Sequence, residues 1–349
     1  MAVRRIAKLA YHVVRSNLVE LHYPYRLTYA VTNRCQAHCS MCNIWRKTAD
    51  GELTMAEIDT FFARSNRFSW INLTGGEIFQ RDDIVEIIRS VDRHCRSLYL
   101  LNFPTNGYQT EKIVAAVADI LTHTSIPRLM VSVSLDGPCE LHDSTRGLPG
   151  SWEQALATFR QLRIMRSRRF SVYLGYTMQE SNLHAFQETV DAARSELGEL
   201  SVDEIHVNLA HISGHYYDNS SFSGLPDPVA AGEILTRIRG LRSRRFLDPV
   251  SVLERRYQKL ARTFQQTGAV PLTCQAAAAS CFIDPGGVVY PCTAFDAPLG
   301  TLREHGYDLY RLWRSAGRHS IRKAVCDGAC PRCWTPCEAY QTILANLLT

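Results

Sequence analysis

Three cysteines, Cys35, Cys39 and Cys42, occur in the segment VTNRCQAHCSMCNIW with the spacing C-x3-C-x2-C. They follow the apolar stretch LTYAVT and are expected on a loop that leaves the carboxyl end of a β-strand. A structural zinc site requires four ligands, and no fourth cysteine is nearby. His38 lies between two of the cysteines and is expected to point away from their shared side. A [4Fe–4S] cluster held by three cysteines would leave one iron open, so the spacing indicates a centre that binds a small ligand.

A second group of cysteines lies near the carboxyl end of the sequence. Its seven members are Cys274, Cys281, Cys292, Cys326, Cys330, Cys333 and Cys337. The last four have the spacing C-x3-C-x2-C-x3-C, which favours metal binding, with zinc as the alternative to iron. The two remaining cysteines, Cys95 and Cys139, stand alone and are expected to be small buried residues.

Composition excludes several classes of protein. The 349 residues are 46% hydrophobic, which suits a large domain with a sizeable core plus a smaller domain. The net charge of +5 is mild and spread out, so nucleic-acid binding is not expected. No apolar run is long enough for a membrane span, and the amino terminus does not resemble a secretory signal. We therefore expect a cytoplasmic protein, in which clustered cysteines more often hold metal than form disulfides.

Residues 1–24 are predicted to form a basic amphipathic helix. Its apolar residues recur at helical spacing among Arg and Lys; they are Ile6, Leu9, Ala10, Val13 and Val14. Such a helix could lie on a membrane surface. The simpler interpretation is a helix that closes one end of the domain.

From residue 26 onward, short apolar stretches alternate with helical patterns. The strand candidates are LTYAVT, WINLTG, SLYLLNF, RLMVSVSLD, SVYLGYTM and EIHVNLAHI. Thr54 and Glu57 have the spacing of a capping box, and Ser151 and Asn182 are predicted N-caps of later helices. Several strands are apolar on both faces, as expected for strands covered by crossover helices. The pattern predicts an α/β fold with a parallel sheet curved into a partial (β/α)6 barrel, whose ligands bind at the carboxyl ends of the strands.

Four segments are predicted along the chain. The amphipathic helix (1–24) precedes the partial barrel (25–224), and a mostly helical connector (225–270) follows the barrel. Residues 271–349 are rich in Gly, Pro and Cys and are expected to form a small cysteine-rich C-terminal domain.

The motif C-x3-C-x2-C after the first strand of an α/β partial barrel resembles the radical S-adenosylmethionine (SAM) superfamily. In that family the open iron binds the amino and carboxylate groups of SAM. The residue before the third cysteine is usually aromatic and is Met41 here. The resemblance covers residues 26–212 and implies a [4Fe–4S] cluster with SAM as cofactors.

Three further strand ends are similar to segments of this family. They are LTGGE at the second strand, PTNG at the third, and SVSLDGPCELHDSTRG at the fourth. The resemblance implies that the GGE motif meets the amino group of SAM, and that the third and fourth segments lie near SAM, its ribose or the substrate cavity. The implied SAM-binding residues are Thr74, Gly75, Gly76, Glu77, Asn106, Ser134 and Asp136.

The second cysteine group resembles the SPASM and twitch extensions of the same superfamily, which bind auxiliary [4Fe–4S] clusters. Gly287 stands five residues before Cys292, as in their GxxxxC element. The resemblance implies a C-terminal iron–sulfur domain with one or two auxiliary clusters. Matching the ends of the motif suggests Cys274, Cys281, Cys292 and Cys337 as ligands of the first cluster. The other three cysteines would then be an incomplete second set or spare ligands.

The implied function is reductive cleavage of SAM to a 5'-deoxyadenosyl radical that abstracts hydrogen from a substrate. The expected outcome is a dehydrogenation or cross-link in a peptide, sugar or other small molecule, with a reductant such as flavodoxin or ferredoxin. His211, His215, Tyr216 and Tyr217 follow the sixth strand candidate and are hypothesised to contact substrate, without an assigned general base. Thr293 stands where sulfatase-maturing relatives carry Asp, which disfavours that activity. The alternatives are a non-catalytic electron-transfer protein and a zinc-binding scaffold.

Overall fold

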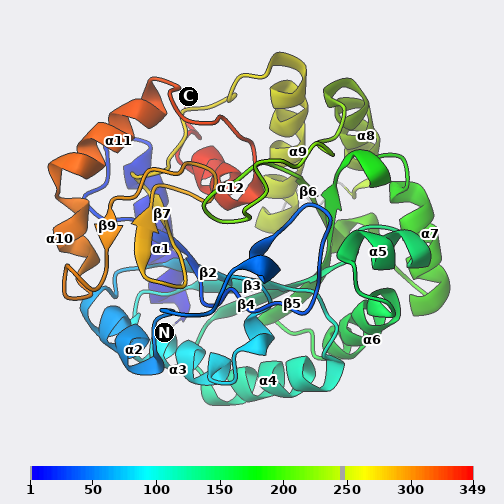
Figure 1. The fold of residues 1–349 in the computed structure, drawn as a ribbon, viewed down its shortest axis with the longest axis horizontal. Helices are drawn as coiled ribbons and strands as arrows, with labels where there is room; N and C mark the ends of the chain where they lie inside the picture. Colours follow the sequence, from blue (N-terminus) through cyan, green and yellow to red (C-terminus); the bar gives the residue numbers. More distant parts are fainter. Residues whose placement is uncertain (1, 244–247, 349) are drawn as a thin grey trace.

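The computed structural model describes residues 2–243 and 248–348 of the chain. Six parallel strands form a curved sheet with the order β6-β5-β4-β3-β2-β1 (Figure 1). They are β1 (Arg26–Ala30), β2 (Trp70–Thr74), β3 (Leu100–Thr105), β4 (Arg128–Ser134), β5 (Phe170–Met178) and β6 (Ile205–Leu209). All six strand candidates are confirmed, and the sheet is the partial barrel that the alternating pattern predicted.

Helices cover the outer face of this sheet. They are α2 (Met55–Arg64), α3 (Ile84–His94), α4 (Thr110–His123), α6 (Ser151–Ile164) and α7 (Phe186–Leu197), while the shorter α5 (Cys139–Arg146) follows β4. Successive side chains of a strand point to opposite faces, so each strand supplies both the core and the barrel interior. Tyr29 of β1, for example, packs edge-on against Phe61 and Phe62 of α2.

The predicted N-caps are confirmed in one case of three. Thr54 and Glu57 form the capping box of α2. Ser151 and Asn182 are not N-caps: α6 begins after Gly150, and α7 begins after Ala185. At α6 the carboxylate of Asp143 accepts hydrogen bonds from the first backbone N–H groups instead, because the preceding helix brings it there.

The cysteine-rich region continues the same sheet. β7 (Ser280–Ile283) pairs in parallel with β1, and β8 (Val288–Tyr290) and β9 (Gly300–Thr301) follow in antiparallel register. The helices α10 (Leu309–Trp313), α11 (Ala316–Cys326) and α12 (Pro336–Leu344) complete this part. The boundary at residue 271 therefore remains a prediction, since the sheet crosses it without a break.

Two helices close the side of the barrel between β6 and the β1–β7 pair (Figure 1). They are α9 (Pro249–Thr267), which follows α8 (Pro228–Leu241), and α12. Arg26 of β1 donates to Gln341 of α12, and Val207 of β6 donates to Glu254 of α9. Residues 244–247 of the predicted connector lie outside the described residues.

The amino-terminal helix α1 (Ala2–Ser16) lies at the amino ends of the strands. Arg5 donates to the backbone oxygens of Leu98 and Ser125, which precede β3 and β4. The helix thus closes one end of the barrel, as the simpler interpretation predicted. None of the described helices is both long and apolar enough to cross a membrane.

The two isolated cysteines differ in burial. Cys95 is fully buried at the end of α3, as predicted. Cys139 is exposed, so the prediction for it is wrong. It is the first residue of α5, and its side chain falls on the solvent side of that short helix.

Candidate active site

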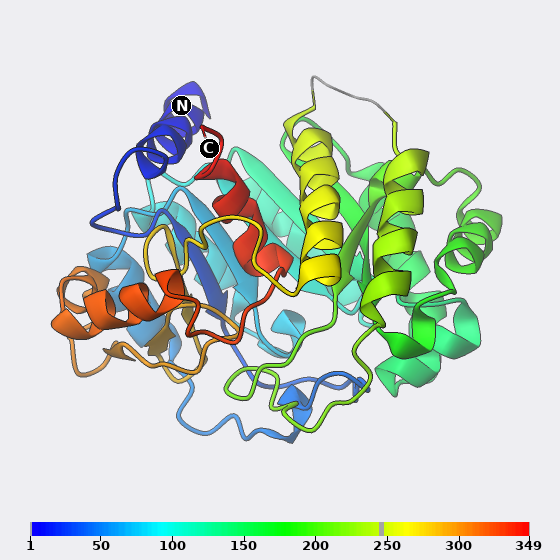
Figure 2. The ribbon, with the colours of Figure 1, turned by 90° about the horizontal axis from the view of Figure 1, so that it is seen from above.

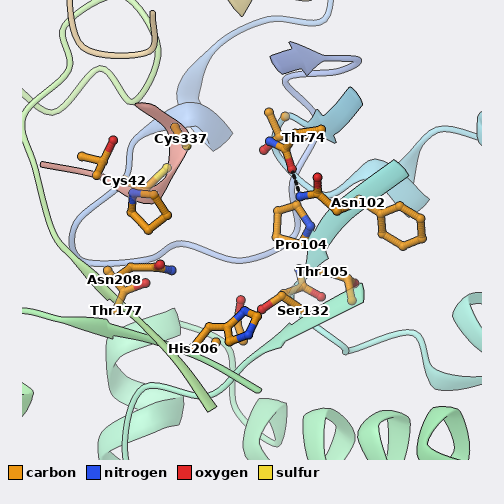
Figure 3. A pocket seen from close by; sticks show the side chains of 18 of the residues that line it. Cys42, Thr74, Asn102, Pro104, Thr105, Ser132, Thr177, His206, Asn208 and Cys337 are labelled. Carbon is orange, nitrogen blue, oxygen red and sulfur yellow. Dashed lines mark hydrogen bonds between the residues drawn. The ribbon is translucent and has the colours of Figure 1, made fainter. Parts of the chain in front are cut away.

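A cavity of about 370 Å³ runs through the interior of the barrel. At one end it is lined by Cys35, Cys39 and Cys42, and at the other by inward-facing residues of the strands. Figure 3 shows Cys42 and Thr74 on one side of the space and His206 on the other. The predicted cysteine loop and the strand ends therefore share one enclosed space.

The cysteine loop crosses directly over the end of β2. The backbone N–H groups of Gly76 and Glu77 donate to the oxygens of Thr32 and Arg34, each at 2.8 Å. A Cβ atom added at Gly75 or Gly76 would lie 2.3 Å from one of these oxygens. Neither position can therefore carry a side chain, because the backbone of the cysteine loop lies too close. This requirement for glycine holds whether or not a ligand also approaches.

The far side of the same loop is held by the segment after β6. The side-chain amide of Asn219 donates to the oxygen of Met41 at 2.9 Å, and the N–H of Asn43 donates to the oxygen of Tyr217 at 2.8 Å. Met41 lines the cavity next to Cys42. The loop is therefore fixed from two sides.

The environment of the thiols fits a bound cationic centre. Burial, together with the neighbouring Cys39, raises the pKa of Cys35 and of Cys42 to about 12. A thiol with so high a pKa ionises only when a metal replaces its proton. The three neighbouring thiols are suited to a three-cysteine cluster with one open iron.

Arg146 lies beside this centre and was missed by sequence reasoning. Its guanidinium lies 3.7 Å from the sulfur of Cys39 and forms an ion pair with Asp136. Asp136 is fully buried and also accepts a hydrogen bond from the N–H of Thr177 at 2.7 Å. The cavity is lined by Arg146 and Ser134 but not by Asp136. Asp136 therefore positions Arg146 instead of reaching toward a ribose.

Glu77 joins the ends of β2 and β3. Its carboxylate accepts hydrogen bonds from the N–H of Asn106 at 2.7 Å and from the hydroxyl of Thr105 at 3.0 Å. Burial raises the pKa of Glu77 to about 7, although these hydrogen bonds oppose the shift. A ligand amino group at this position would favour the ionised carboxylate.

Asn106 presents an unpaired donor to the cavity. Its side-chain oxygen accepts from the N–H of Tyr108 at 3.0 Å and from Gln36 at 3.3 Å. Its Nδ2 atom is buried without a hydrogen-bond partner. A buried donor is costly unless a partner satisfies it, so the site fits a ligand acceptor such as a carboxylate or hydroxyl.

The four candidate residues after β6 lie in two different places. Tyr216, Tyr217 and His211 line the cavity, as their position in the sequence suggested. The hydroxyl of Tyr216 lies 2.8 Å from that of Thr74 and 3.2 Å from the oxygen of Gly75. Tyr216 therefore braces the GGE motif from inside the cavity.

His215 does not line the cavity. Its Nε2 atom lies 3.2 Å from the oxygen of Cys292, and its ring stacks on Tyr290 with centroids 4.3 Å apart. The structure thus places His215 against the cysteine-rich region and not beside the cavity.

The inner end of the cavity is polar, which the sequence reasoning did not single out. The indole N–H of Trp70 donates to Asn102 at 2.6 Å, and Asn102 donates to Asn72. Ser132 lies near these residues (Figure 3). The available signal was a polar residue at alternate positions of otherwise apolar strands.

His206 is the titratable group on the inner wall. Its ring stacks on Tyr173 with centroids 4.1 Å apart. Burial lowers its pKa, and its Nε2 atom is buried without a hydrogen-bond partner. The neutral ring therefore offers one nitrogen to the cavity (Figure 3).

Behind His206, a buried network ties α9 to α12. The carboxylate of Glu254 accepts from the hydroxyl of Tyr340 at 2.6 Å and from Arg242 at 3.4 Å. Glu254 and Tyr340 both line the cavity. The side of the barrel is closed here by Glu254 and Tyr340, which hydrogen-bond to each other.

In the cysteine-rich region, four cysteines are mutual neighbours. Cys274, Cys292 and Cys333 pack in one cluster with Val325, and Cys330 raises the pKa of both Cys274 and Cys333. Among the described residues, no three His, Cys, Asp or Glu side chains are gathered tightly enough to hold a single metal ion.

The other three cysteines of this group lie elsewhere. Cys281 is fully buried in β7 beside Leu27, in the main core. Cys337 lines the barrel cavity on α12, and Cys326 is exposed at the end of α11. Cys281 thus lies in the main core, whereas the suggested grouping of Cys337 with Cys274 and Cys292 stays a prediction, because Cys337 hydrogen-bonds to Thr293, the neighbour of Cys292.

Comparison with known proteins agrees with this geometry. Residues 29–193 match the family described as the radical SAM superfamily. Residues 274–334 match the SPASM family, described as an iron–sulfur cluster-binding domain. The chain is 24% identical over 314 residues to the AdoMet-dependent heme synthase of Methanosarcina barkeri, a match that covers 84% of this chain and 83% of that protein.

Solved structures share the fold. The crystal structure of Streptococcus suis SuiB bound to S-adenosylmethionine has a TM-score of 0.59 and 14% identity, covering 86% of this chain and 68% of SuiB. Native anSMEcpe with bound AdoMet and the Cp18Cys peptide has a TM-score of 0.58 and 17% identity, covering 86% of this chain and 83% of anSMEcpe.

Proposed function

Because the chain belongs to the radical SAM superfamily and carries a SPASM iron–sulfur domain, we propose that it oxidises a small polar molecule, or one peptide side chain, held in the barrel cavity. The chain is a radical SAM enzyme, so the electron-transfer and zinc-scaffold alternatives are set aside. Its cofactors are a [4Fe–4S] cluster with SAM and the auxiliary clusters of the SPASM domain. When bound, they supply single electrons and the reductive cleavage of SAM to methionine and a hydrogen-abstracting 5'-deoxyadenosyl radical.

The cysteine loop and the strand ends are proposed to bind the cluster and SAM. Cys35, Cys39 and Cys42 are the proposed ligands, since they are half-buried neighbours at one end of the cavity. Glu77 is proposed to accept a hydrogen bond from the amino group of SAM. The unpaired Nδ2 atom of Asn106 is proposed to donate to a SAM oxygen.

The auxiliary site is proposed to use Cys274, Cys292, Cys330 and Cys333. The support is that Cys274, Cys292 and Cys333 pack in one cluster with Cys330 close to two of them, whereas Cys281 lies in the main core and Cys326 is exposed. This proposal favours one auxiliary cluster with four protein ligands over two clusters.

The inner end of the cavity is the proposed substrate site. The amides of Asn72 and Asn102 and the hydroxyl of Ser132 offer hydrogen bonds that position a polar substrate. Oxidation of a carbon that carries a hydroxyl or amino group would pass one hydrogen atom to the 5'-deoxyadenosyl radical and one electron to the auxiliary cluster, and it would release a proton. The buried Nε2 atom of the neutral His206 is proposed to accept that proton.

One observation supports a substrate no larger than a small molecule or a single side chain. The cavity is closed at its side by α9 and α12, through Glu254 and Tyr340. A polypeptide would reach the inner end only from the carboxyl ends of the strands, with one side chain inserted. The peptide complex of anSMEcpe, which shares the fold, supports the second kind of substrate, one peptide side chain.

The test is anaerobic turnover of the reconstituted enzyme with dithionite and SAM, with 5'-deoxyadenosine as the measured product. We expect product from the wild type and none from Cys39→Ala. Absence of product from wild type with a reduced cluster and bound SAM would contradict the proposal. His206→Phe separates the two parts of the mechanism, because it is expected to form 5'-deoxyadenosine while substrate oxidation falls.

A further inference from the structure

The exposed apolar side chains of this protein are concentrated at one place. Thirteen large apolar side chains are exposed among the described residues, and six of them lie between residues 3 and 19. They are Val3, Ile6, Tyr11, Val14, Leu18 and Val19. Two more, Leu347 and Leu348, are near the other end of the chain. A patch of this kind marks an interaction surface.

The helix cannot turn this surface inward, because its opposite side is anchored. Arg5 is buried and pairs with Asp92 at 3.6 Å in addition to its bonds to backbone oxygens. The ring of His12 stacks on Tyr25 with centroids 5.8 Å apart. At 100° per residue, Val3 and Val14 fall on the side facing away from these anchors. The sequence predicted one apolar face, and the structure buries only its Leu9–Val13 edge.

The carboxyl-terminal residues extend this surface. The side-chain amide of Asn17 donates to the oxygen of Leu344 at 2.7 Å, and the N–H of Leu347 donates back to Asn17 at 2.7 Å. Both termini therefore lie side by side (Figure 2). Leu347 and Leu348 are held next to the end of α1. We call the exposed residues Val3, Ile6, Val14 and Leu18, with Leu347 and Leu348, the α1 apolar face.

The charged residues of α1 beside this face are all basic. At the same 100° per residue, a strip along its edge is formed by Arg4, Lys8 and Arg15, which lie within about 40° of one another on the helical wheel. The helix sequence AVRRIAKLAYHVVRS contains no acidic residue. Two copies packed through this face would bring like charges together, whereas anionic headgroups would neutralise them.

We propose that the α1 apolar face docks on the surface of an anionic lipid bilayer. The apolar side chains enter the interfacial region and the basic strip contacts the headgroups, as in amphipathic helices that lie in the membrane plane. The amino end of the barrel then faces the membrane. The cysteine loop lies at the opposite end (Figure 2) and stays open to a water-borne reductant.

The experiment is vesicle co-sedimentation with the full-length, anaerobically reconstituted enzyme. One set of vesicles is phosphatidylcholine alone and the other contains phosphatidylglycerol. We expect at least about tenfold tighter binding to the anionic vesicles, weakened by salt. Arg4→Gln with Lys8→Gln is expected to reduce binding about fivefold for each cation removed.

The apolar contribution has a matched control. The triple variant V3S/V14S/L18S removes side chains that are 79%, 58% and 67% exposed, so folding does not depend on them. It is expected to abolish sedimentation. The variant I164S/V229S removes side chains that are 82% and 67% exposed on other helices and is expected to bind as wild type.

Three results would overturn the proposal. One is that the wild type sediments with neither kind of vesicle. Another is that the control variant I164S/V229S loses as much binding as V3S/V14S/L18S. The third is a concentration-dependent dimer that V3S/V14S/L18S dissociates, which would assign the face to a second copy. Production of 5'-deoxyadenosine in solution tests the proposed function separately and is expected to be equal in all these variants.

Discussion

The guanidinium of Arg146 lies 3.7 Å from the sulfur of Cys39 and pairs on its other side with the buried carboxylate of Asp136. The pair joins α5, the end of β4 and the cysteine loop at one point. It places a fixed positive charge beside the proposed cluster, whose thiolate ligands are negative. Several consequences of this arrangement are measurable.

Replacing only one member of this ion pair should lower the free energy of unfolding more than replacing both members. Arg146→Gln leaves Asp136 buried without a counter-charge, and the expected loss is about 3–5 kcal/mol in the free energy of unfolding. The double variant D136N/R146Q removes both charges and should recover most of that loss. Denaturant unfolding of the protein without clusters measures both. Equal destabilisation by the single and double variants would show that the ion pair is not the cause.

Binding of SAM should strengthen as the pH rises through about 7. The pKa of Glu77 is raised to about 7 by burial, so below that pH the carboxyl is increasingly protonated and cannot pair with a ligand amino group. Affinity should fall by at most about tenfold per pH unit on the acid side. Equilibrium dialysis from pH 6 to 8 measures this dependence. Glu77→Gln should bind weakly and with a flatter profile; an unchanged profile would remove Glu77 from the SAM site.

Gly76→Ala should disrupt the cysteine loop. Its Cβ atom would lie 2.3 Å from the oxygen of Arg34, so the loop must move. We expect loss of the first cluster, measured as iron bound per chain after reconstitution. Gly240→Ala is the matched control, because a Cβ there meets no atom within 4 Å and α8 is continuous. Retention of full iron content in Gly76→Ala would contradict the proposed loop geometry.

The proposed auxiliary ligands can be separated from the other cysteines. Cys333→Ala should lower iron by about four atoms per chain, the content of one cluster. The variants Cys326→Ala and Cys281→Ala should bind as much iron per chain as the wild type, since Cys326 is exposed and Cys281 lies in the core. Loss of iron in Cys281→Ala, with its secondary structure intact by circular dichroism, would return that residue to the ligand set.

Most of the barrel was predictable because its signals are local. Each strand is a short apolar run, and the capping box at Thr54 depends only on residues three positions apart. The N-caps predicted at Ser151 and Asn182 are wrong, although α6 does start at Ser151. At α6 the capping carboxylate comes from Asp143, outside the helix itself.

The grouping of the later cysteines was not predictable from spacing. The position of Cys281 depends on the pairing of β7 with β1, which buries it in the sheet, and Cys337 lines the barrel cavity from α12. The roles of Asp136 and Arg146 likewise depend on how α5 folds back on the cysteine loop. The inner polar wall could have been found, because Asn72 and Asn102 interrupt apolar strands at inward-facing positions.

The central claim is that SAM binds the cluster held by Cys35, Cys39 and Cys42. The most direct measurement is the electron paramagnetic resonance spectrum of the reduced enzyme before and after addition of SAM. The account predicts that SAM changes the spectrum of wild type and of Cys333→Ala, and that the changed signal is missing from Cys39→Ala. A SAM-dependent change that persists in Cys39→Ala, or one that is missing from wild type, would contradict it.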